Sequence, residues 1–442
     1  MKAYAKMYST CFIAKVFLLA FFSVFSLLAA ADAKVSAGDM IDDSNWEKVE
    51  GLIPDKVLNW VKNGEWTLDI QQLTFNPSEM YTDEVKEATK ANQGKYDIHE
   101  QGYVVEKDTR EVPNFIAGIP FPEIDEDDPV KAAYQVLNNS VYARNVCGNV
   151  DLEIPIRWIG PEGLERRVVM DYLTIPYVGH PDYEAISNPE KFHYKNIIHV
   201  SYPYDVAGTA VMLWRYLGGE PDVNFSYVPA IRRVRRMTPA SRSDAFLGSD
   251  FCLDDMAGYD AKLSSFDMKV LRVQEAVVPY NSEKPYKMVD TPDGGVQISH
   301  DNKEIKFGYE TEGWEGAAWA QTNLVWVKRP VYVIELTPKD PYYNYGTHEL
   351  WVTKGRYTPC YKIIYDRSGE YWKTMVSPMV GVEGQNGKYK SIEYANLVMV
   401  DERSNHATAT IQQSPDKDLE FIWMGDLNRQ DFTISGFQKY CK

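Results

Sequence analysis

Short apolar runs dominate the chain from about residue 151 onward. They are rich in Val, Ile, Tyr, Trp and Thr, and residues that favour turns (Gly, Pro, Asn and Asp) separate them. This pattern and spacing predict a large antiparallel sheet, curled or closed into a barrel. A hairpin turn is expected at residues 366–369. The runs that we interpret as strands are 168–174, 196–202, 210–217, 263–273, 324–327, 331–336, 348–353, 361–365, 371–376, 391–399 and 407–412.

Residues 34–145 have a different texture, helical and irregular. We expect a short amphipathic helix at 55–61 and a polar helix through about residue 91, with Ser78 as its N-cap. A further helix is expected to end at about residue 143. The acidic residues 125–128 precede it, and negative charge at a helix start complements the helix dipole. The sequence therefore predicts an N-terminal segment, residues 34–145, that packs on a sheet domain, residues 146–442.

The first 33 residues have the three-part layout of a secretory signal. Lys2, Lys6 and Lys15 precede an apolar run over residues 16–31, and Ala31 and Ala33 then supply the small residues of a cleavage site. The apolar run is shorter than the roughly 20 residues that span a bilayer. We therefore expect cleavage after Ala33 and export of the mature chain.

Composition narrows the class of protein further. Of 442 residues, 44% are hydrophobic and 25% are charged, which is the usual balance of a globular protein. The 63 acidic residues outnumber the 47 basic ones, giving a net charge of −16. A nucleic-acid binder normally carries the opposite balance, because phosphate contacts require a basic surface. We therefore expect no nucleic-acid partner.

Four cysteines follow the expected cleavage site. An even number in an oxidising compartment is consistent with two disulfides, and the sequence leaves all three pairings open. We expect at least one bridge. The candidates are Cys147, Cys252, Cys360 and Cys441.

Recognisable catalytic chemistry is missing from the sequence. There is no nucleophile elbow, no zinc-protease helix and no phosphate-binding glycine loop, and the seven His are scattered. We therefore predict no catalytic residue, no metal and no cofactor. A secreted hydrolase that uses paired carboxylates stays an alternative, because a carboxylate pair is recognised only by its geometry.

The strongest local feature is a run of arginines at residues 232–236. If this run forms a strand, Arg233 and Arg235 point to one face and Arg232 and Arg236 to the other. One interpretation is structural: Arg232 and Arg236 pair with the downstream aspartates and fix a loop over the sheet. The other is functional: the arginines bind an anionic headgroup. The aspartates in question are Asp250 and Asp254.

A family resemblance rests on this region and on segments downstream of it. The Tyr-Val-Pro strand end at 227–229, the arginine run and Gly-Ser-Asp-Phe at 248–251 resemble the outer-membrane lipoprotein-sorting (LolA/LolB-like) superfamily. Further along the chain, the segments at 329–339, 350–352 and 365–369 resemble a strand, a second strand and a hairpin that follow one another in the same order in this superfamily. More closely, the chain resembles the bacterial family called domain of unknown function 1329. The segments that carry these likenesses are 119–122, 329–339, 340–346, 350–352, 365–369 and 437–441.

The resemblance implies a fold and a function. The fold class would be α+β, mainly β: a half-open β-barrel in which helices cover the concave face of a curved antiparallel sheet and enclose an apolar cavity. The function would be binding and transfer of a lipid or other hydrophobic molecule in the periplasm of a Gram-negative bacterium. The partners would be an RND-type transporter and an outer-membrane barrel protein.

A carrier of this kind needs an apolar lining rather than catalytic groups. Apolar strand positions supply the candidates for that lining, and Arg233 and Arg235 are the candidates for an anionic headgroup. A non-enzymatic interaction subunit of an envelope complex is the main alternative to a carrier. The candidate lining residues are Met212, Trp214, Trp326, Trp351 and Trp372.

Overall fold

The computed structural model describes residues 35–412 and 419–441. The expected signal segment, residues 1–33, lies outside them. Within the described part of the chain, no helix combines the length and the apolar character needed to cross a membrane.

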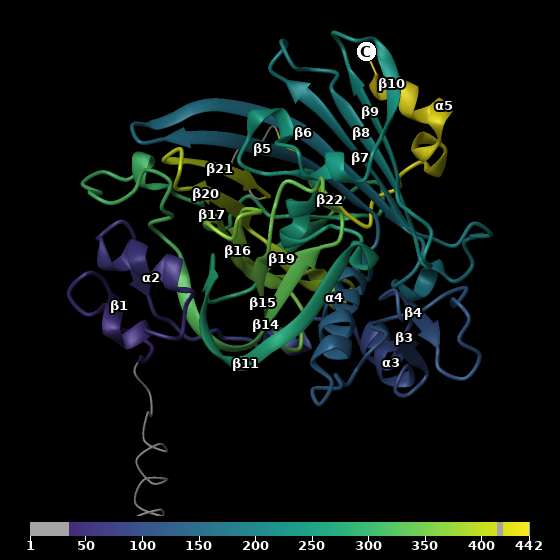
Figure 1. Ribbon diagram of the computed structural model, residues 1–442, viewed down its shortest axis with the longest axis horizontal. Helices are drawn as coiled ribbons and strands as arrows, with labels where there is room; N and C mark the ends of the chain where they lie inside the picture. Colours follow the sequence, from purple (N-terminus) through teal and green to yellow (C-terminus); the bar gives the residue numbers. More distant parts are fainter. Residues whose placement is uncertain (1–34, 413–418, 442) are drawn as a thin grey trace, which may run out of the picture.

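A long antiparallel sheet forms the body of the molecule (Figure 1). Thirteen strands follow one another from one edge of this sheet to the other, and each pairs with its neighbours. In spatial order the strands are β10 (Arg233–Met237), β9 (Val223–Val228), β8 (Ala210–Tyr216), β7 (Phe192–Tyr202), β6 (Gly163–Pro176), β5 (Val150–Gly160), β21 (His406–Ile411), β20 (Asn396–Asp401), β17 (Tyr371–Val376), β16 (Pro359–Tyr365), β15 (His348–Thr353), β14 (Val325–Pro338) and β11 (Phe266–Tyr280).

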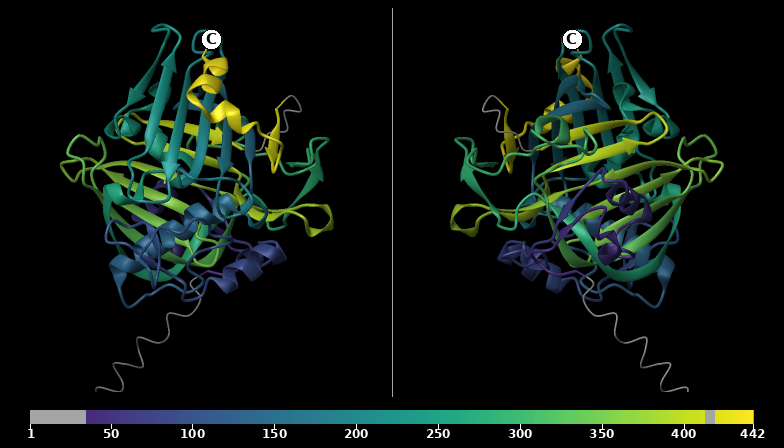
Figure 2. Two further views of the ribbon diagram at one scale, coloured as in Figure 1. Left: turned by 90° about the vertical axis from the view of Figure 1, so that its right-hand side faces the viewer. Right: turned by 90° about the vertical axis from the view of Figure 1, so that its left-hand side faces the viewer.

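A smaller group of strands joins β11 back to β5. It consists of β12 (Tyr286–Asp290), β13 (Val296–Ile298), β18 (Met379–Glu383), β19 (Lys390–Tyr394) and β22 (Phe421–Trp423). β18 pairs with β11, β12 and β19, while β22 pairs with β13 and β5. The sheet thus curves around a hollow, and β6–β10 extend beyond it as a wing (Figures 1 and 2). The expected mainly β fold with one large curved antiparallel sheet is confirmed.

Most of the predicted runs lie within strands of the structure. The predicted start at residue 263 is wrong, because residues 263–265 form a 3-10 turn and β11 begins at Phe266. The runs at 348–353 and 371–376 match β15 and β17 in full. The runs at 324–327 and 331–336 belong to one strand, β14, because its ladder to β11 continues through Lys328 and Arg329. The run at 391–399 is divided between β19 and β20. The hairpin turn at 366–369 is present, closed by the Gly369 amide donating to the Asp366 carbonyl at 3.0 Å.

Four α-helices are described: α2 (Asp55–Lys62), α3 (Asp83–Ala91), α4 (Pro129–Asn145) and α5 (Ile434–Phe437). The expected start of the second helix at Ser78 is wrong. Pro77–Glu79 forms a separate 3-10 turn, and the side chain of Thr82 caps α3 instead. The start of α4 is as the acidic run suggests, because Asp128 accepts from the amides of Val130 and Lys131 at 3.1 and 3.0 Å.

Residues 240–263, which we call the inner segment, fill much of the hollow together with α4. Phe251, Leu253, Asp254 and Asp255 are each at most 5% exposed. The opposite face of the wing is covered by residues 429–441, which we call the C-terminal cover and which run along it in Figure 2. Phe432 and Phe437 pack there against Ile175, Ile197 and Met212. Both faces of β7 and β8 are therefore largely buried.

The N-terminal segment packs on the same core as the sheet. Its short strands are β1 (Met40–Ile41) with β2 (Leu68–Asp69), and β3 (Tyr96–Ile98) with β4 (Val104–Glu106). The indole of Trp66 donates to the backbone carbonyl of Gln321 at 2.8 Å. The backbone amide of Gln71 donates to the backbone carbonyl of Trp326 at 2.8 Å. The division into two units at residue 145 stays a prediction.

Candidate ligand-binding cavity

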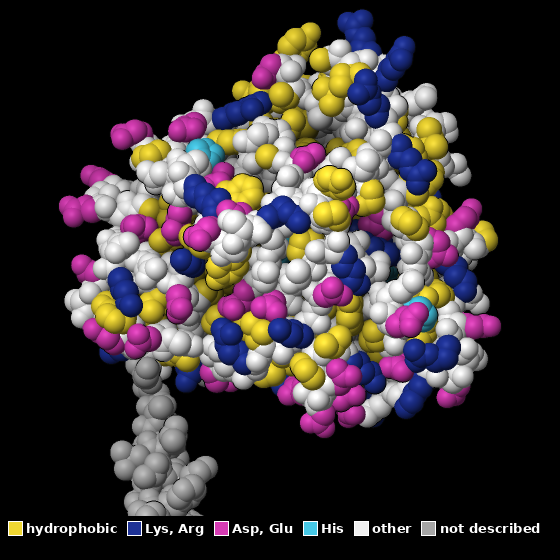
Figure 3. All heavy atoms as spheres, viewed as in Figure 1, with side chains coloured by type: hydrophobic (Ala, Val, Ile, Leu, Met, Phe, Trp, Pro, Cys, Tyr) yellow, Lys and Arg dark blue, Asp and Glu magenta, His cyan; other side chains and the backbone are white. Residues whose placement is uncertain are grey.

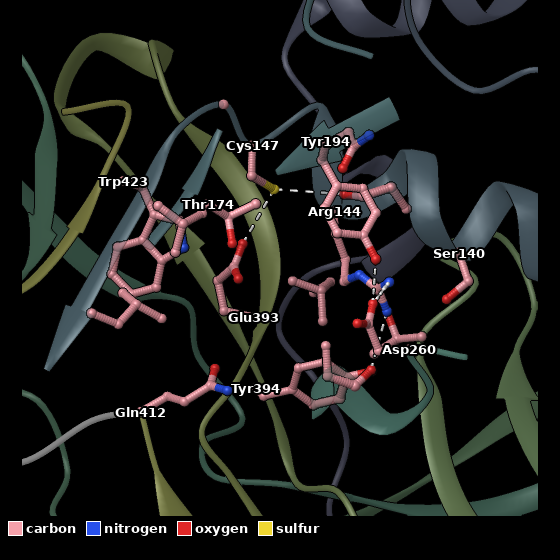
Figure 4. Close-up of a pocket in the computed structure, with 18 of the residues that line it drawn as sticks. Ser140, Arg144, Cys147, Thr174, Tyr194, Asp260, Glu393, Tyr394, Gln412 and Trp423 are labelled. Atoms are coloured by element: carbon pink, nitrogen blue, oxygen red, sulfur yellow. Dashed lines mark hydrogen bonds and ion pairs between the residues drawn. The ribbon is translucent and has the colours of Figure 1, made fainter. Parts of the chain in front are cut away.

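An interior cavity of about 90 Å³ lies where the C-terminal end of α4 meets β5, β6, β19, β22 and the inner segment (Figure 4). Its apolar wall is built by strand residues whose side chains face the hollow. They are Val150, Leu152, Ile392, Tyr394 and Trp423. Pockets for drug-sized ligands measure roughly 300–1,000 Å³. In this arrangement the cavity therefore has room for the end of a ligand, and a longer molecule would require the covering elements to move.

One polar cluster on the wall surrounds the thiol of Cys147. Its Sγ lies 3.1 Å from the Ser391 hydroxyl and donates to Glu393 Oε1 at 3.3 Å. Ser391 donates to the same carboxylate oxygen at 2.5 Å and accepts from Arg356 Nη2 at 2.6 Å. Burial, followed by the charge of Glu393, raises the pKa of the Cys147 thiol to about 12. Near neutral pH it is therefore a hydrogen-bond donor and not a nucleophilic thiolate.

A second polar cluster lies across the cavity in Figure 4 and fixes Asp260. Tyr194 donates its hydroxyl to Asp260 Oδ1 at 2.5 Å, and Arg144 and Arg215 each approach that oxygen at 3.3 Å. Arg242 donates to the other carboxylate oxygen at 3.0 Å. Because its acceptor positions are filled by protein donors, Asp260 anchors the inner segment.

The other aspartates of the inner segment are paired in the same way, but not with the arginines that the sequence suggested. Asp254 accepts from Arg242 at 2.5 Å, and Asp250 accepts from His406 at 2.7 Å. Arg232 and Arg236 are exposed on the far edge of the wing. The predicted pairing of Arg232 and Arg236 with Asp250 and Asp254 is therefore wrong: basic groups from distant parts of the chain lie nearer to the aspartates.

The predicted lining residues lie away from this cavity. Met212 and Trp214 face the C-terminal cover, where the Trp214 indole donates to the Phe432 carbonyl at 2.9 Å. Trp326 packs on Trp66, with ring centroids 5.2 Å apart.

The remaining candidates are also elsewhere. Trp351 packs on Tyr361, with ring centroids 5.8 Å apart, and the Trp372 indole donates to Asp401 at 2.8 Å. Arg233 and Arg235 are exposed on β10.

Sequence reasoning missed the residues that do line the cavity. β5 was not predicted, because Glu153, Pro155 and Arg157 interrupt its apolar positions. The alternation of Leu152, Ile154 and Ile156, each at most 3% exposed, was the available signal. Arg356 lies in a turn and gave no signal.

The expected disulfide is contradicted, since all four described cysteines are free. Cys147 follows α4, Cys252 lies in the inner segment, Cys360 lies on β16 and Cys441 lies at the end of the C-terminal cover. Three of the thiols hydrogen-bond within their own surroundings, as when Cys360 donates to the Trp351 carbonyl at 3.3 Å. The even number of cysteines therefore did not mean that their thiols lie close enough to form disulfides.

Among residues 35–412 and 419–441, no group of three or more His, Cys, Asp and Glu side chains is arranged to hold a metal ion. Two further hollows lie at the surface. One, of about 410 Å³, is bordered by Ala37, Leu73 and Phe75, and the other, of about 310 Å³, by Tyr96 and Phe121.

The fold and the cavity together define a curved-sheet protein in which a helix and an inner segment cover part of the concave side of the sheet. The chain belongs to the family of proteins of unknown function DUF1329, whose model matches residues 40–437. The expected family is thus confirmed. Comparison with the curated proteins gives no significant match.

The solved structures that are similar to this chain include the following three. A domain named for outer-membrane lipoprotein sorting, from Vibrio parahaemolyticus, is 16% identical, with a TM-score of 0.46 over 71% of this chain and 100% of that one. A DUF1329 protein from Desulfovibrio piger is 17% identical, with a TM-score of 0.44 over 70% and 98%. A LolA superfamily protein from Nitrosomonas europaea is 15% identical, with a TM-score of 0.37 over 69% and 98%. At this level of similarity no ligand or partner is transferred from these proteins.

Proposed function

We propose that this chain is a binding and transfer protein for a lipid or another hydrophobic molecule. The observation that carries the proposal is the interior cavity, with its apolar wall on β5, β19 and β22 and its polar groups on α4 and Arg356. A pocket lined by apolar side chains with a few polar groups is typical of small-molecule sites. The proposal gives the chain no catalytic role.

The size of the cavity sets the mechanism. An apolar tail gains about 0.8 kcal/mol for each methylene that it buries. A tail of about ten methylenes therefore gains about 8 kcal/mol, which can offset displacement of part of the cover. In this mechanism the tail enters as α4 or the inner segment moves aside, and it leaves when a partner offers a surface of higher affinity.

Export by a cleaved signal peptide would place this exchange in the periplasm of a Gram-negative bacterium. An RND-type transporter and an outer-membrane barrel protein would then deliver or accept the ligand. These assignments extend the proposal and do not affect the test of binding.

Native mass spectrometry of the exported protein, purified without detergent, tests the proposal. A bound hydrophobic molecule is expected in the wild type and is expected to be lost in Ala143→Leu, because Ala143 lines the interior cavity. The matched control is Ala37→Leu, which alters the exposed groove of about 410 Å³ and should keep the ligand.

Loss in the control but not in Ala143→Leu would place the ligand in the outer groove. A wild type with no bound molecule, and no binding of added lipid, would refute the carrier. It would favour the alternative that the chain is a non-enzymatic interaction subunit of an envelope complex, which needs no cavity for a ligand.

A further inference from the structure

Arg356 is a buried cation for which the described residues provide no carboxylate at ion-pair distance. It is 2% exposed and lines the interior cavity. Two other arginines are as deeply buried, and both form ion pairs: Arg215 with Asp222 at 2.5 Å and Arg242 with Asp254 at 2.5 Å. Buried charges are normally paired, because removing a charge from water is costly. The exception at Arg356 therefore requires an explanation.

One nitrogen of the Arg356 guanidinium has no hydrogen-bond partner. Nη1 donates to the Ala143 carbonyl at 3.1 Å, and Nη2 donates to Ser391 at 2.6 Å and to Cys147 Sγ at 3.7 Å. The guanidinium carbon lies 4.1 Å from the centre of the Tyr81 ring. Nε is buried without a partner. The side-chain amide nitrogen of Asn145, another lining residue, is also buried without a partner. The same cavity thus has two unused donors.

Glu393 forms no ion pair with Arg356 and is linked to it only through Ser391 and Cys147, which both contact the two side chains. Its Oε1 accepts from Ser391 at 2.5 Å, from Cys147 at 3.3 Å and from Tyr389 at 3.1 Å. Across the cavity, Asp260 is held by Arg144, Arg215 and Arg242. Both carboxylates therefore have their own donors, and Arg356 lacks a direct acceptor of opposite charge.

We propose that Arg356 binds the carboxylate of an amphiphile, whose alkyl chain lies along Leu152, Ile392 and Trp423. This inference rests on the proposed function and names its ligand class. A guanidinium matches a carboxylate in geometry and charge. A carboxylate is also small enough for a cavity of about 90 Å³.

Calorimetric titration with laurate, dodecanol and dodecyl phosphate tests the inference, because the three share one chain length and differ in the headgroup. We expect laurate to bind the wild type about tenfold or more tightly than dodecanol, the effect of a charge-assisted hydrogen bond. Arg356→Gln should abolish that preference. The control Arg403→Gln, which removes an arginine paired with Asp366 at the surface, should retain it.

Equal binding of laurate and dodecanol by the wild type would overturn the inference and leave the carrier intact. Tighter binding of dodecyl phosphate than of laurate would overturn the choice of a carboxylate. Failure of all three to bind would count against the proposed function itself. The wild-type comparison stands even if Arg356→Gln does not fold.

An independent observation concerns the tip of the wing, which comprises the turns at 203–209 and 229–232 together with β10. Both turns lie at one end of the sheet, because Ala210 pairs with both His199 and Tyr227. Apolar side chains protrude there: Tyr204 is 97% exposed and Ile231 is 43% exposed.

Four exposed arginines accompany these apolar side chains. None of them forms an ion pair with a described residue, although the chain carries a net charge of −16. Figure 3 shows basic side chains gathered at the upper end of the molecule, where Figure 1 shows β9 and β10. The arginines are Arg232, Arg233, Arg235 and Arg236.

We propose that the tip of the wing docks on an anionic phospholipid bilayer. The arginines would contact phosphates, and Tyr204 and Ile231 would enter the interface, where aromatic side chains are favoured. At physiological salt a charge is screened beyond about 8 Å, so the acidic body repels the membrane little when the tip approaches first. An acidic protein partner would explain the arginines but not the exposure of Tyr204 and Ile231.

Co-sedimentation with vesicles of phosphatidylcholine, with and without phosphatidylglycerol, tests this second inference. Binding is expected only with the anionic lipid, and each Arg→Glu change at Arg233 or Arg235 should weaken it about fivefold or more. Lys287→Glu, at one exposed lysine away from the tip, is the charge-matched control. Three results would overturn the proposal. They are equal binding to vesicles with and without the anionic lipid, a control variant that weakens binding as much as the arginine variants do, and no binding to either kind of vesicle.

Discussion

The replacement Asp255→Asn tests how firmly the inner segment is held in the hollow. Lys362 and Asp255 are both fully buried, with Nζ and Oδ1 2.5 Å apart. The second carboxylate oxygen accepts from the Tyr345 hydroxyl and the Cys252 amide, each at 2.9 Å. Asparagine keeps the shape but removes the charge, so Lys362 would remain buried without a counter-ion. Breaking such a pair costs about 3–5 kcal/mol.

Equilibrium unfolding in urea, followed by tryptophan fluorescence and circular dichroism, measures this loss. Burial opposes ionisation of Asp255, but the charge of Lys362 holds its pKa below the usual value. The contribution of the carboxylate is therefore present above about pH 3.9 and is lost as the pH falls through the folded pKa. The difference in unfolding free energy between wild type and Asp255→Asn should therefore become smaller at acidic pH.

The control for this experiment is Asp267→Asn. Asp267 pairs with Lys339 at 3.4 Å, but its side chain is 76% exposed, so we expect a loss below about 1 kcal/mol. A loss for Asp255→Asn as small as that of the control would refute the reasoning that the buried pair anchors the inner segment.

Three further predictions concern other parts of the molecule. The hydrogen bond from His406 to Asp250 raises the pKa of His406 despite partial burial. The stabilisation of the fold by protonated His406 is therefore complete below about pH 6.5 and is lost as the pH rises through the folded pKa. The unfolding free energy of His406→Gln, measured in urea, should lack this dependence on pH. Prolonged alkylation of the native protein at about pH 8 should modify only Cys441 among the four described cysteines, because it alone of them is not buried; burial raises its pKa to about 11, so the reaction should be slow. A bridged pair found by peptide mapping would contradict the structure. Phe437→Ala should cost about 3–5 kcal/mol and shift the emission of Trp214 to the red, and unchanged stability would show that the C-terminal cover does not pack on the wing through Phe437.

The sheet could be predicted from the sequence because its strands have strong local signals. The wing shows where that reasoning stops. In β8, Met212 faces the C-terminal cover, whereas Leu213 faces α4 through Val141. Alternation identifies two faces, but it does not reveal which face borders the hollow when both are buried.

The inner segment could not be predicted for a different reason. Its Gly, Ser and Asp residues are typical of an exposed loop. They are buried because Arg215, Lys362 and His406, distant in sequence, supply opposite charges or hydrogen bonds. The missing partner of Arg356 is likewise a property of the folded chain alone.

Photo-crosslinking with a fatty acid that carries a diazirine at its tail most directly tests the claim that the interior binds a hydrophobic carboxylate. After irradiation, peptide mapping should place the label on residues of the interior wall such as Leu152, Tyr172 and Ile392, and unlabelled laurate should compete for it. Label confined to the outer groove at Leu73 and Phe75, with none on the interior wall, would contradict the claim.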